Sequence, residues 1–323
     1  MGMRRLGATE FEITPIGLGC MQFAGRGIGE RYYPALEKDT VTSIVRSALD
    51  GGVNWFDTAE MYGRGNSERS LTTALRDLGA APGKVVIATK WTPWLRKASS
   101  IGATIGDRLA SLQGYPVDLH QIHMPYGSLS SVPSQLRAMA DLVDAGTVTS
   151  VGVSNFSARQ MELASHLLRS RGLSLASNQV QISLLHRKAE RDGTLDAARR
   201  LGVTLIAFGP LRSGLLTGKF HEDPERIRSI RGARRALAGF NAKTLARTAP
   251  LIDELRAIGR AYGVTISQVG LTWLITFYGD TVVAIPGASK PRQATESAAA
   301  MDLRLTRKEL DRLDELSRTG EKS

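Results

Sequence analysis

The chain has 323 residues, of which 42% are hydrophobic and 23% charged, and its formal net charge is +11. It is long enough to bury a substantial core, and its composition is typical of a globular protein. No apolar run reaches the roughly 20 residues that a membrane span needs, and the first residues lack the apolar core of a secretory signal. Cys20 is the single cysteine, so no internal disulfide can form, and we expect a cytoplasmic location and no membrane partner.

The positive charge raises the question of a nucleic-acid partner. Basic residues are densest at Arg226, Arg228, Arg231, Arg234 and Arg235. The sequence has no helix-turn-helix signature, no ribonucleoprotein aromatic motif and no zinc-finger spacing. We therefore expect a solvated basic face and no nucleic-acid partner, with part of the charge serving to attract a polyanionic cofactor.

Short apolar runs of strand composition alternate with helical stripes along the chain. The predicted strands are 13–19, 53–56, 85–89, 118–122, 147–153, 175–180, 203–208 and 281–285. The predicted helices are 37–50, 67–78, 100–112, 133–145, 157–169, 194–201, 250–262, 266–277, 291–301 and 306–317. A polar and basic region at 219–244 interrupts this alternation and is expected to be a loop or insertion after the seventh strand, either a lid or disordered.

Strict alternation of strands and helices implies a parallel sheet covered by helices. Eight such units in a chain of this length favour a closed (β/α)₈ TIM barrel over an open doubly wound sheet. No linker divides the chain, so we predict one barrel domain over residues 1–323. In such a barrel the active site lies at the C-terminal ends of the strands.

Consecutive predicted strands end on residues that suit acid–base chemistry. Asp57 ends the second strand, Tyr62 follows it, and Lys90 and His123 end the next two. A nearby ammonium lowers the pKa of a phenol, and a carboxylate can hold that ammonium in place. His123 could then orient a substrate carbonyl by donating a hydrogen bond. No side chain can supply a hydride, so a reduction at this site requires a nicotinamide cofactor.

These residues lie in segments that together resemble the aldo-keto reductase superfamily. The resemblance covers nearly the whole chain and is carried by residues 56–63, 88–90, 118–125, 151–156, 183–187, 209–219 and 285–289. It implies a TIM barrel that binds extended NADPH across the strand ends. It also implies that Tyr62 is the general acid, that Lys90 lowers its pKa, that Asp57 supports Lys90, and that His123 orients the carbonyl.

The resemblance further implies a set of cofactor contacts. Ser154, Asn155 and Gln179 would hold the carboxamide, Phe208 would stack on the nicotinamide, and residues 209–219 would wrap the pyrophosphate. Ser289 and Lys290 suit a 2′-phosphate, which favours NADPH over NADH. The full predicted set is Cys20, Met21, Asp57, Ser154, Asn155, Gln179, Phe208, Gly209, Pro210, Leu211, Gly214, Leu216, Lys219, Gly287, Ser289, Lys290, Gln293, Glu296 and Ser297.

The substrate is expected to be a small carbonyl compound. Phe23, Trp91, Trp94 and Met124 lie near strand ends and predict an apolar pocket for a hydrophobic aldehyde or ketone, with sugar and pyridoxal-like aldehydes as alternatives. No Cys/His cluster suggests a metal. A nicotinamide-nucleotide-binding regulatory subunit of an ion channel, built on the same fold, is the main alternative to a reductase. A barrel with isomerase chemistry is a more distant one.

Overall fold

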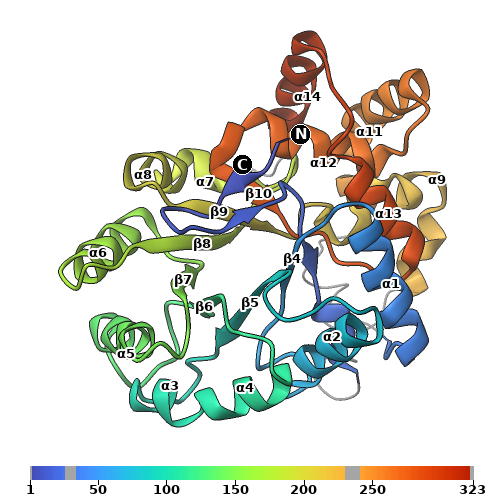
Figure 1. Cartoon of the computed structure of the whole chain (residues 1–323). Helices are drawn as coiled ribbons and strands as arrows, with labels where there is room; N and C mark the ends of the chain where they lie inside the picture. Colours follow the sequence, from blue (N-terminus) through green and yellow to red (C-terminus); the bar gives the residue numbers. More distant parts are fainter. Residues whose placement is uncertain (1, 26–33, 230–240, 321–323) are drawn as a thin grey trace.

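Eight parallel strands form one sheet in which each strand pairs with its neighbours in sequence (Figure 1). The computed structural model describes residues 2–25, 34–229 and 241–320. The strands are β3 (Leu18–Gly19), β4 (Trp55–Asp57), β5 (Val86–Trp91), β6 (Leu119–Ile122), β7 (Ser150–Ser154), β8 (Leu175–Gln181), β9 (Thr204–Phe208) and β10 (Val282–Ala284). Parallel bridges from Ile16 to Ala284 and from Gly19 to Gly287 join the first strand to the last. The predicted (β/α)₈ barrel is therefore confirmed.

Helices surround the strands on their outer side (Figure 1). They are α1 (Lys38–Asp50), α2 (Asn66–Asp77), α3 (Ser99–Ala103), α4 (Ile105–Leu112), α5 (Val132–Asp144), α6 (Ala158–Arg169), α7 (Lys188–Arg191), α8 (Thr194–Leu201), α9 (Lys219–Glu222), α11 (Ala242–Tyr262), α12 (Ile266–Phe277), α13 (Pro291–Ala299) and α14 (Arg307–Gly320). Short 3₁₀ helices are η1 (Met21–Ala24), η3 (Arg212–Thr217), η4 (Pro224–Ser229) and η5 (Gly279–Thr281). None of the helices in the described ranges is long and apolar enough to cross a membrane. The cytoplasmic location stays a prediction.

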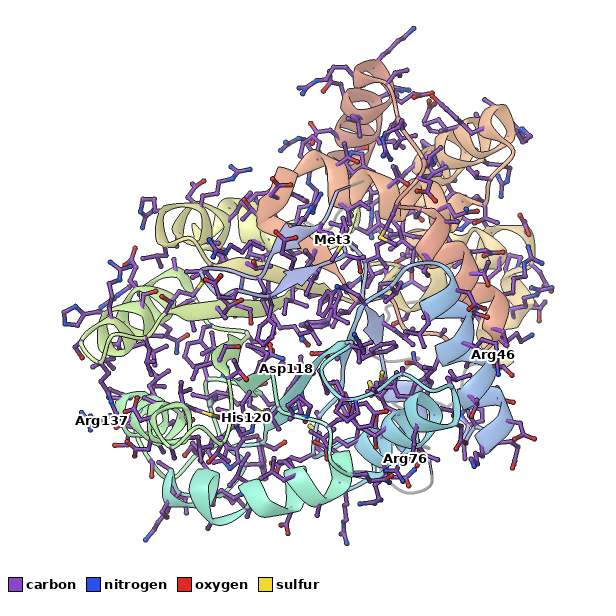
Figure 2. The ribbon with its side chains drawn as sticks, viewed as in Figure 1. Met3, Arg46, Arg76, Asp118, His120 and Arg137 are labelled. Atoms are coloured by element: carbon purple, nitrogen blue, oxygen red, sulfur yellow. The ribbon has the colours of Figure 1, made fainter. Side chains whose placement is uncertain are left out.

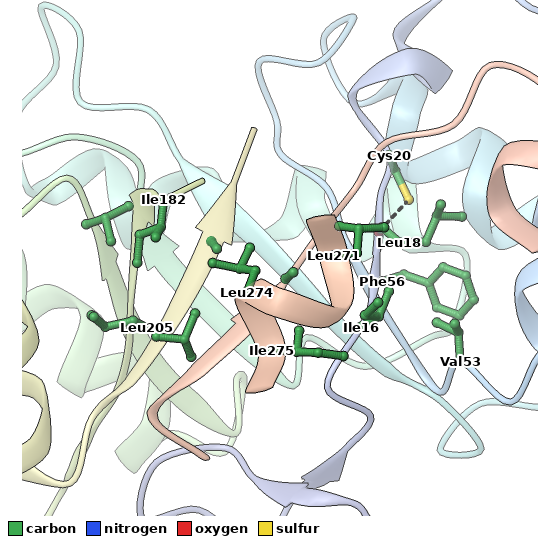
Figure 3. Packing of buried hydrophobic residues seen from close by; sticks show 14 of the residues in the cluster. Ile16, Leu18, Cys20, Val53, Phe56, Ile182, Leu205, Leu271, Leu274 and Ile275 are labelled. Atoms are coloured by element: carbon green, nitrogen blue, oxygen red, sulfur yellow. Dashed lines mark hydrogen bonds between the residues drawn. The ribbon is translucent and has the colours of Figure 1, made fainter. Parts of the chain in front are cut away.

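Alternation along the strands divides the core into two layers. Trp55, Val86 and Leu119 pack inside the barrel. Phe56 and Leu205 face outward, where they join a larger cluster with the surrounding helices, and Figure 3 shows Leu271, Leu274 and Ile275 of α12 in this layer. Because successive strand residues point to opposite sides, a polar residue two positions after an interior one also points inward. This rule directs the polar strand ends toward the barrel mouth.

The N-terminal segment differs from the predicted single strand over 13–19. Strands β1 (Arg4–Arg5) and β2 (Glu12–Ile13) form an antiparallel hairpin. In this segment only the strand Leu18–Gly19 belongs to the barrel sheet. Leu6 and Ile13 of this hairpin segment pack into the barrel interior with Trp55. Proline cannot donate to a strand ladder, and Pro15 separates the two pieces.

Two predicted helix boundaries were also wrong. The helix expected over 100–112 is divided into α3 and α4 at Thr104. Helix α11 begins at Ala242 rather than at Pro250, because the Asn241 side chain accepts a hydrogen bond from the Thr244 amide at 2.8 Å. The region 219–244 accordingly contains α9, η4 and the start of α11, so its described part is not a simple loop.

Part of the basic region lies outside the described residues. Residues 230–240, which include Arg231, Arg234 and Arg235, lie outside the described residues. The single-domain assignment over 1–323 stays a prediction.

Helix α6 starts shortly after the end of β7, and Ser157 caps its N-terminus. The Gln160 amide donates to Ser157 Oγ at 3.4 Å, and the Ser157 amide donates to the Gln160 side chain at 2.9 Å. We expect Ser157→Ala to lower the free energy of unfolding by about 1 kcal/mol, because a helix amide loses its partner. Urea denaturation measures this loss. Ser170→Ala at the other end of α6 is the control, and an equal loss in both variants would contradict the assignment.

Candidate active site

The four residues predicted to be catalytic lie together at the C-terminal end of the barrel. Asp57 ends β4, Lys90 lies in β5, His123 follows β6, and Tyr62 lies in the loop between β4 and α2. Lys90 Nζ is 2.5 Å from Asp57 Oδ1 and 5.2 Å from the centre of the Tyr62 ring. The rings of Tyr62 and His123 meet edge to face, with their centres 5.8 Å apart. The ring of Tyr62 therefore lies close to both the ammonium and the imidazole.

The Asp57–Lys90 pair is almost entirely removed from solvent, with side-chain exposures of 2% and 0%. Asp57 Oδ2 accepts hydrogen bonds from Gln121 at 3.1 Å and from Gln179 at 2.7 Å. Lys90 Nζ also donates to the carbonyl of Thr58 at 2.8 Å. A buried charge is stable only when it is paired and hydrogen-bonded, and both members of this pair meet that condition.

Burial and charge act in opposite directions on these groups. Burial disfavours the charged form of Lys90, but Asp57 and Tyr62 outweigh it, so the pKa of Lys90 lies above its usual value. Burial raises the pKa of Tyr62 above its usual 10.0, by more than the ammonium of Lys90 lowers it. Lys90 thus acts in the predicted direction, but the net shift is upward. The phenol is protonated at neutral pH, as a proton donor must be.

His123 is neutral at physiological pH. Burial, together with the charge of Lys90, lowers the pKa of His123 to about 3. Its Nδ1 is buried without a hydrogen-bond partner. The ring also lines the cleft, and a neutral imidazole keeps one N–H with which it can orient a carbonyl oxygen by hydrogen bonding.

The loop that carries Tyr62 is fixed against η1. Ser67 Oγ donates to the carbonyl of Cys20 at 2.6 Å and accepts from Thr58 Oγ1 at 2.9 Å. Gly63 has φ +69°, and a Cβ there would lie 1.9 Å from the carbonyl oxygen of Ala24. Only glycine fits this close approach, so the turn after Tyr62 is set by the backbone.

A cleft of about 900 Å³ opens above these residues. Of the predicted site residues, its lining includes Cys20, Met21, Asp57, Tyr62, His123, Ser154, Asn155, Gln179, Phe208, Gly209, Pro210, Leu211, Gly214, Lys219, Gly287, Ser289 and Gln293. Lys90 lies beneath the floor, behind Asp57. Leu216, Lys290, Glu296 and Ser297 are not part of the lining.

The residues predicted to form the substrate pocket are also outside the lining. Phe23 and Trp91 are buried in the outer core layer, and Met124 is half-buried beside the site. Trp91 follows the inward-pointing Lys90, so it points outward, where Arg96 lies 5.3 Å from its ring centre. Trp94 is exposed.

Sequence reasoning missed a second group of lining residues. They are Gly19, Gln22, Ala24, Pro34, Leu36, Met61, Gln181, Ile285 and Pro286, whereas Arg212, Ser213 and Thr217 also line the cleft but belong to the loop 209–219 that the resemblance already assigned to the pyrophosphate. Most lie beside predicted residues, and strand alternation points to Gln181, two positions after Gln179. Pro34 and Leu36 lie before α1, and no motif marks them.

The loop after β9 has a backbone suited to an anion. Arg212, Ser213 and Gly214 are three consecutive residues with positive φ, at 48°, 54° and 94°. Successive left-handed residues turn backbone amides toward a common point, and such turns bind phosphate groups. Lys219 lies next to Gly214 and adds a positive charge. This loop is therefore a candidate site for an anionic group.

Polar groups of Ser154, Asn155 and Gln179 also line the cleft and form hydrogen bonds with one another. Asn155 has φ +60°, and its side-chain amide donates to Ser154 Oγ at 3.0 Å. Ser154 Oγ in turn donates to the Gln179 carbonyl at 2.9 Å. At the start of α13, the Gln293 side chain accepts a hydrogen bond from the Ser289 amide at 2.8 Å.

Buried histidines are expected to make the folded protein less stable as the pH falls. Figure 2 labels His120 and Asp118 on the strand layer. Burial, followed by the charges of Arg108 and Arg96, lowers the pKa of His120 to about 3. His123 has a similar value, whereas burial raises the pKa of Asp118 to about 6.

Between about pH 6.5 and pH 3 the unfolded chain binds a proton at each histidine that the native protein does not bind, so stability falls as pH falls. Asp118 and Glu68, whose pKa values are raised by burial, act in the opposite sense, whereas the lowered pKa values of His221 and Asp314 add to the effect of the two histidines. We expect the free energy of unfolding to be lower at about pH 4.5 than at about pH 7, and His120→Leu to reduce that difference. Urea titrations at both pH values measure it. Equal differences in the two proteins would contradict the assignment.

Comparison with known proteins agrees with this fold. Residues 15–318 match the family model described as the aldo/keto reductase family, and the chain belongs to that family. It is therefore an NAD(P)H-dependent oxidoreductase that acts on carbonyl groups. An uncharacterized oxidoreductase of Mycobacterium tuberculosis is 37% identical over 317 residues, covering 95% of this chain and 90% of the relative.

Two further proteins are similar along nearly the full length. The chloroplastic pyridoxal reductase of Arabidopsis thaliana is 30% identical, over 96% of this chain and 85% of its own. The crystal structure of an aldo/keto reductase from Klebsiella pneumoniae in complex with NADP and acetate has a TM-score of 0.73 and 25% identity, covering 98% of this chain and 96% of that one.

Proposed function

We propose that this protein reduces an aldehyde or ketone to the alcohol with NADPH as hydride donor, and that Tyr62 is the general acid. The observation that carries the proposal is the buried Asp57–Lys90 pair against the ring of Tyr62, at the floor of the cleft. A structural relative was solved with NADP and acetate, which supports the choice of cofactor.

The residues present fit this cofactor. Asn155 and Gln179 would bind the carboxamide, and Phe208 would lie against the nicotinamide face. The positive-φ loop around Ser213, with Lys219, would hold the pyrophosphate. Ser289 and the exposed Lys290 would bind the 2′-phosphate at the start of α13. When bound, NADPH supplies the hydride.

The chain's own residues supply the proton. Tyr62 donates its phenolic proton to the carbonyl oxygen as the carbonyl carbon accepts the hydride, so the product is a neutral alcohol. Lys90 stabilises the phenolate that remains, and Asp57 keeps Lys90 charged and in place. His123 holds the carbonyl oxygen by a hydrogen bond from its neutral ring. A proton from water then restores the phenol.

The substrate is proposed to be a hydrophobic aldehyde or ketone. Met21, Ala24, Pro34, Leu36 and Met61 line the same cleft as Tyr62 and His123. Apolar walls with a few polar groups are typical of sites that bind small organic molecules. We therefore add Met61 to the proposed substrate contacts, while Met21 was predicted as a cofactor contact and Phe23 and Trp91 lie outside the lining of this cleft.

A steady-state assay with NADPH and a panel of aldehydes tests the proposal. We expect NADPH oxidation that depends on the aldehyde, with the highest kcat/KM for hydrophobic aldehydes. Tight binding of NADPH without turnover of any carbonyl would favour the regulatory-subunit alternative. An absence of both binding and turnover would contradict the cofactor assignment itself.

A further inference from the structure

The outer faces of β5 and the Tyr62 loop carry a buried cluster of charged and polar side chains that the reaction scheme does not use. We call it the outer ionic cluster; its members are Glu60, Glu68, Thr89, Arg96 and Arg108. Lys90 points into the barrel, so the preceding Thr89 points outward. The cluster therefore lies on the opposite side of the strand layer from the Asp57–Lys90 pair.

Glu60 is the centre of the cluster and lies two residues before Tyr62. Its Oε1 accepts hydrogen bonds from the Thr92 amide and from Arg96 Nη1, each at 2.5 Å. Its Oε2 lies 3.4 Å from Arg108 Nη1. The Glu60 side chain is only 11% exposed, so these charge-assisted contacts are shielded from solvent.

The remaining contacts connect the Tyr62 loop to the strand that carries Lys90. Arg108 Nη1 lies 3.5 Å from Glu68 Oε2, and Glu68 Oε1 accepts from Thr89 Oγ1 at 2.5 Å. Thr89 immediately precedes Lys90, and Thr92 follows it by two residues. Glu60 is thus bound to the chain after Lys90 directly, and to the chain before Lys90 through Arg108 and Glu68.

This connection bears on the position of Tyr62 because there is space behind its loop. A cavity of about 540 Å³ lies on the outer side, lined by Glu60, Met61, Arg64 and Arg108 among others. A loop bordered by open space is not held by packing on that side. On this outer side, the ion pairs of Glu60 add to the backbone hydrogen bond from the Glu60 amide to the Lys90 carbonyl, at 3.3 Å, in opposing a movement of the Tyr62 loop away from Lys90.

The cluster is poorly suited to a purely stabilising role. Arg108 Nε and Glu68 Oε2 are buried without a hydrogen-bond partner. An incompletely satisfied buried ion cluster contributes little net stability, and an apolar replacement is often as stable. A role in fixing geometry explains its presence better.

We propose that Glu60 is a positioning residue for the reduction: through Arg96, Arg108 and the Thr92 amide it holds the Tyr62 loop at its working distance from Lys90. The proposal rests on the proposed function, because it takes Tyr62 as the acid. Glu60 touches neither cofactor nor substrate in this account.

Glu60→Gln tests the proposal, because the amide still accepts from Thr92 but no longer carries the charge that both arginines bind. We expect kcat for reduction of 4-nitrobenzaldehyde by NADPH to fall about 10- to 100-fold, as a displaced acid predicts. The KM and Kd for NADPH remain unchanged. Glu162→Gln, which breaks an exposed pair with Arg200, is the matched control and leaves kcat unchanged.

The pH profile separates positioning from a general loss of structure. Tyr62 faces Lys90, Asp57, Cys20 and His123; Lys90 lowers its pKa, whereas Asp57 and Cys20 raise it. If Tyr62 moves away from Lys90, the decline of kcat at high pH moves: upward where the loss of the ammonium dominates, and downward where exposure of the phenol to water dominates. A loss of folded protein lowers kcat at every pH without moving that decline. Arg96→Gln, at a partly exposed side chain, provides a second variant with the same expected shift.

Three results would overturn the proposal. The first is an unchanged kcat in Glu60→Gln, and the second is a lower kcat with an unmoved high-pH decline in both variants. The third is a wild-type protein that binds NADPH but reduces no carbonyl, which would also overturn the proposed function. If the wild-type protein is active and Glu60→Gln has the same kcat, only the positioning role is overturned.

Discussion

Tyr62→Phe is expected to lower kcat for carbonyl reduction by about 10²- to 10⁴-fold, the usual contribution of a general acid. The substitution removes only the phenolic oxygen, so the ring still packs against His123 and Lys90. NADPH contacts other parts of the cleft in this account, and its affinity is expected to stay the same. Stopped-flow measurement of NADPH oxidation and a fluorescence titration with NADPH provide both values.

Tyr262→Phe is the control for this substitution. Tyr262 lies at the end of α11, where its hydroxyl donates to Glu309 at 3.1 Å, remote from the cleft. Its kcat is expected to match that of the unsubstituted protein. A Tyr62→Phe protein with undiminished kcat would exclude Tyr62 as the acid and leave His123 or water as the donor.

Lys90→Met is expected to have two large effects, because it leaves the Asp57 carboxylate buried without its ion partner. Loss of one member of a buried ion pair lowers the free energy of unfolding by about 3–5 kcal/mol. The phenolate of Tyr62 also loses the charge that stabilises it, so kcat falls as well. Urea denaturation and the aldehyde assay measure the two effects on the same preparation.

The double substitution Asp57→Asn with Lys90→Met separates them. It removes both charges while Gln121 and Gln179 can still hydrogen-bond the side chain at position 57, so stability is expected to return in part. Activity is expected to stay low. Lys38→Met, which breaks the exposed pair with Asp77, is the control and is expected to leave stability nearly unchanged. A Lys90→Met protein as stable as that control would contradict a buried charged pair.

The catalytic group of residues could be predicted because strand alternation and strand ends are local properties. A run such as 86–91 shows where a strand ends, and a parallel barrel brings those ends together. The same rule would have directed Trp91 outward once Lys90 was placed inward, and Gln121 inward toward Asp57. The orientation of Trp91 follows from alternation within one strand, whereas the contact of Gln121 with Asp57 also required the register of neighbouring strands, which single segments do not contain.

Other features depend on contacts between distant segments. The N-terminal hairpin is fixed by Arg4, whose guanidinium donates to the carbonyls of Val282 and Ile275. No local pattern at Arg4 indicates this. The left-handed backbone at Arg212 and Ser213 is equally hidden, because neither residue is a glycine. The cofactor positions were predicted from the family resemblance, and not from the residues themselves.

The pKa of Tyr62 also depends on contacts between distant segments. Sequence reasoning correctly gave the sign of the effect of Lys90 on Tyr62, but the extent of burial depends on the whole fold. Burial dominates and raises the pKa of the phenol. The residue therefore suits a proton donor that stays protonated until the reaction.

The pH dependence of single-turnover NADPH oxidation, with cofactor and aldehyde both saturating, tests the central claim most directly. His123, with a pKa of about 3, adds no transition near neutrality, whereas Tyr62 titrates above its usual 10.0. We predict a rate that is constant through neutral pH and declines only in the alkaline range. A decline centred near the ordinary histidine value of about 6.5 would contradict the account, because the proton would then come from an imidazolium.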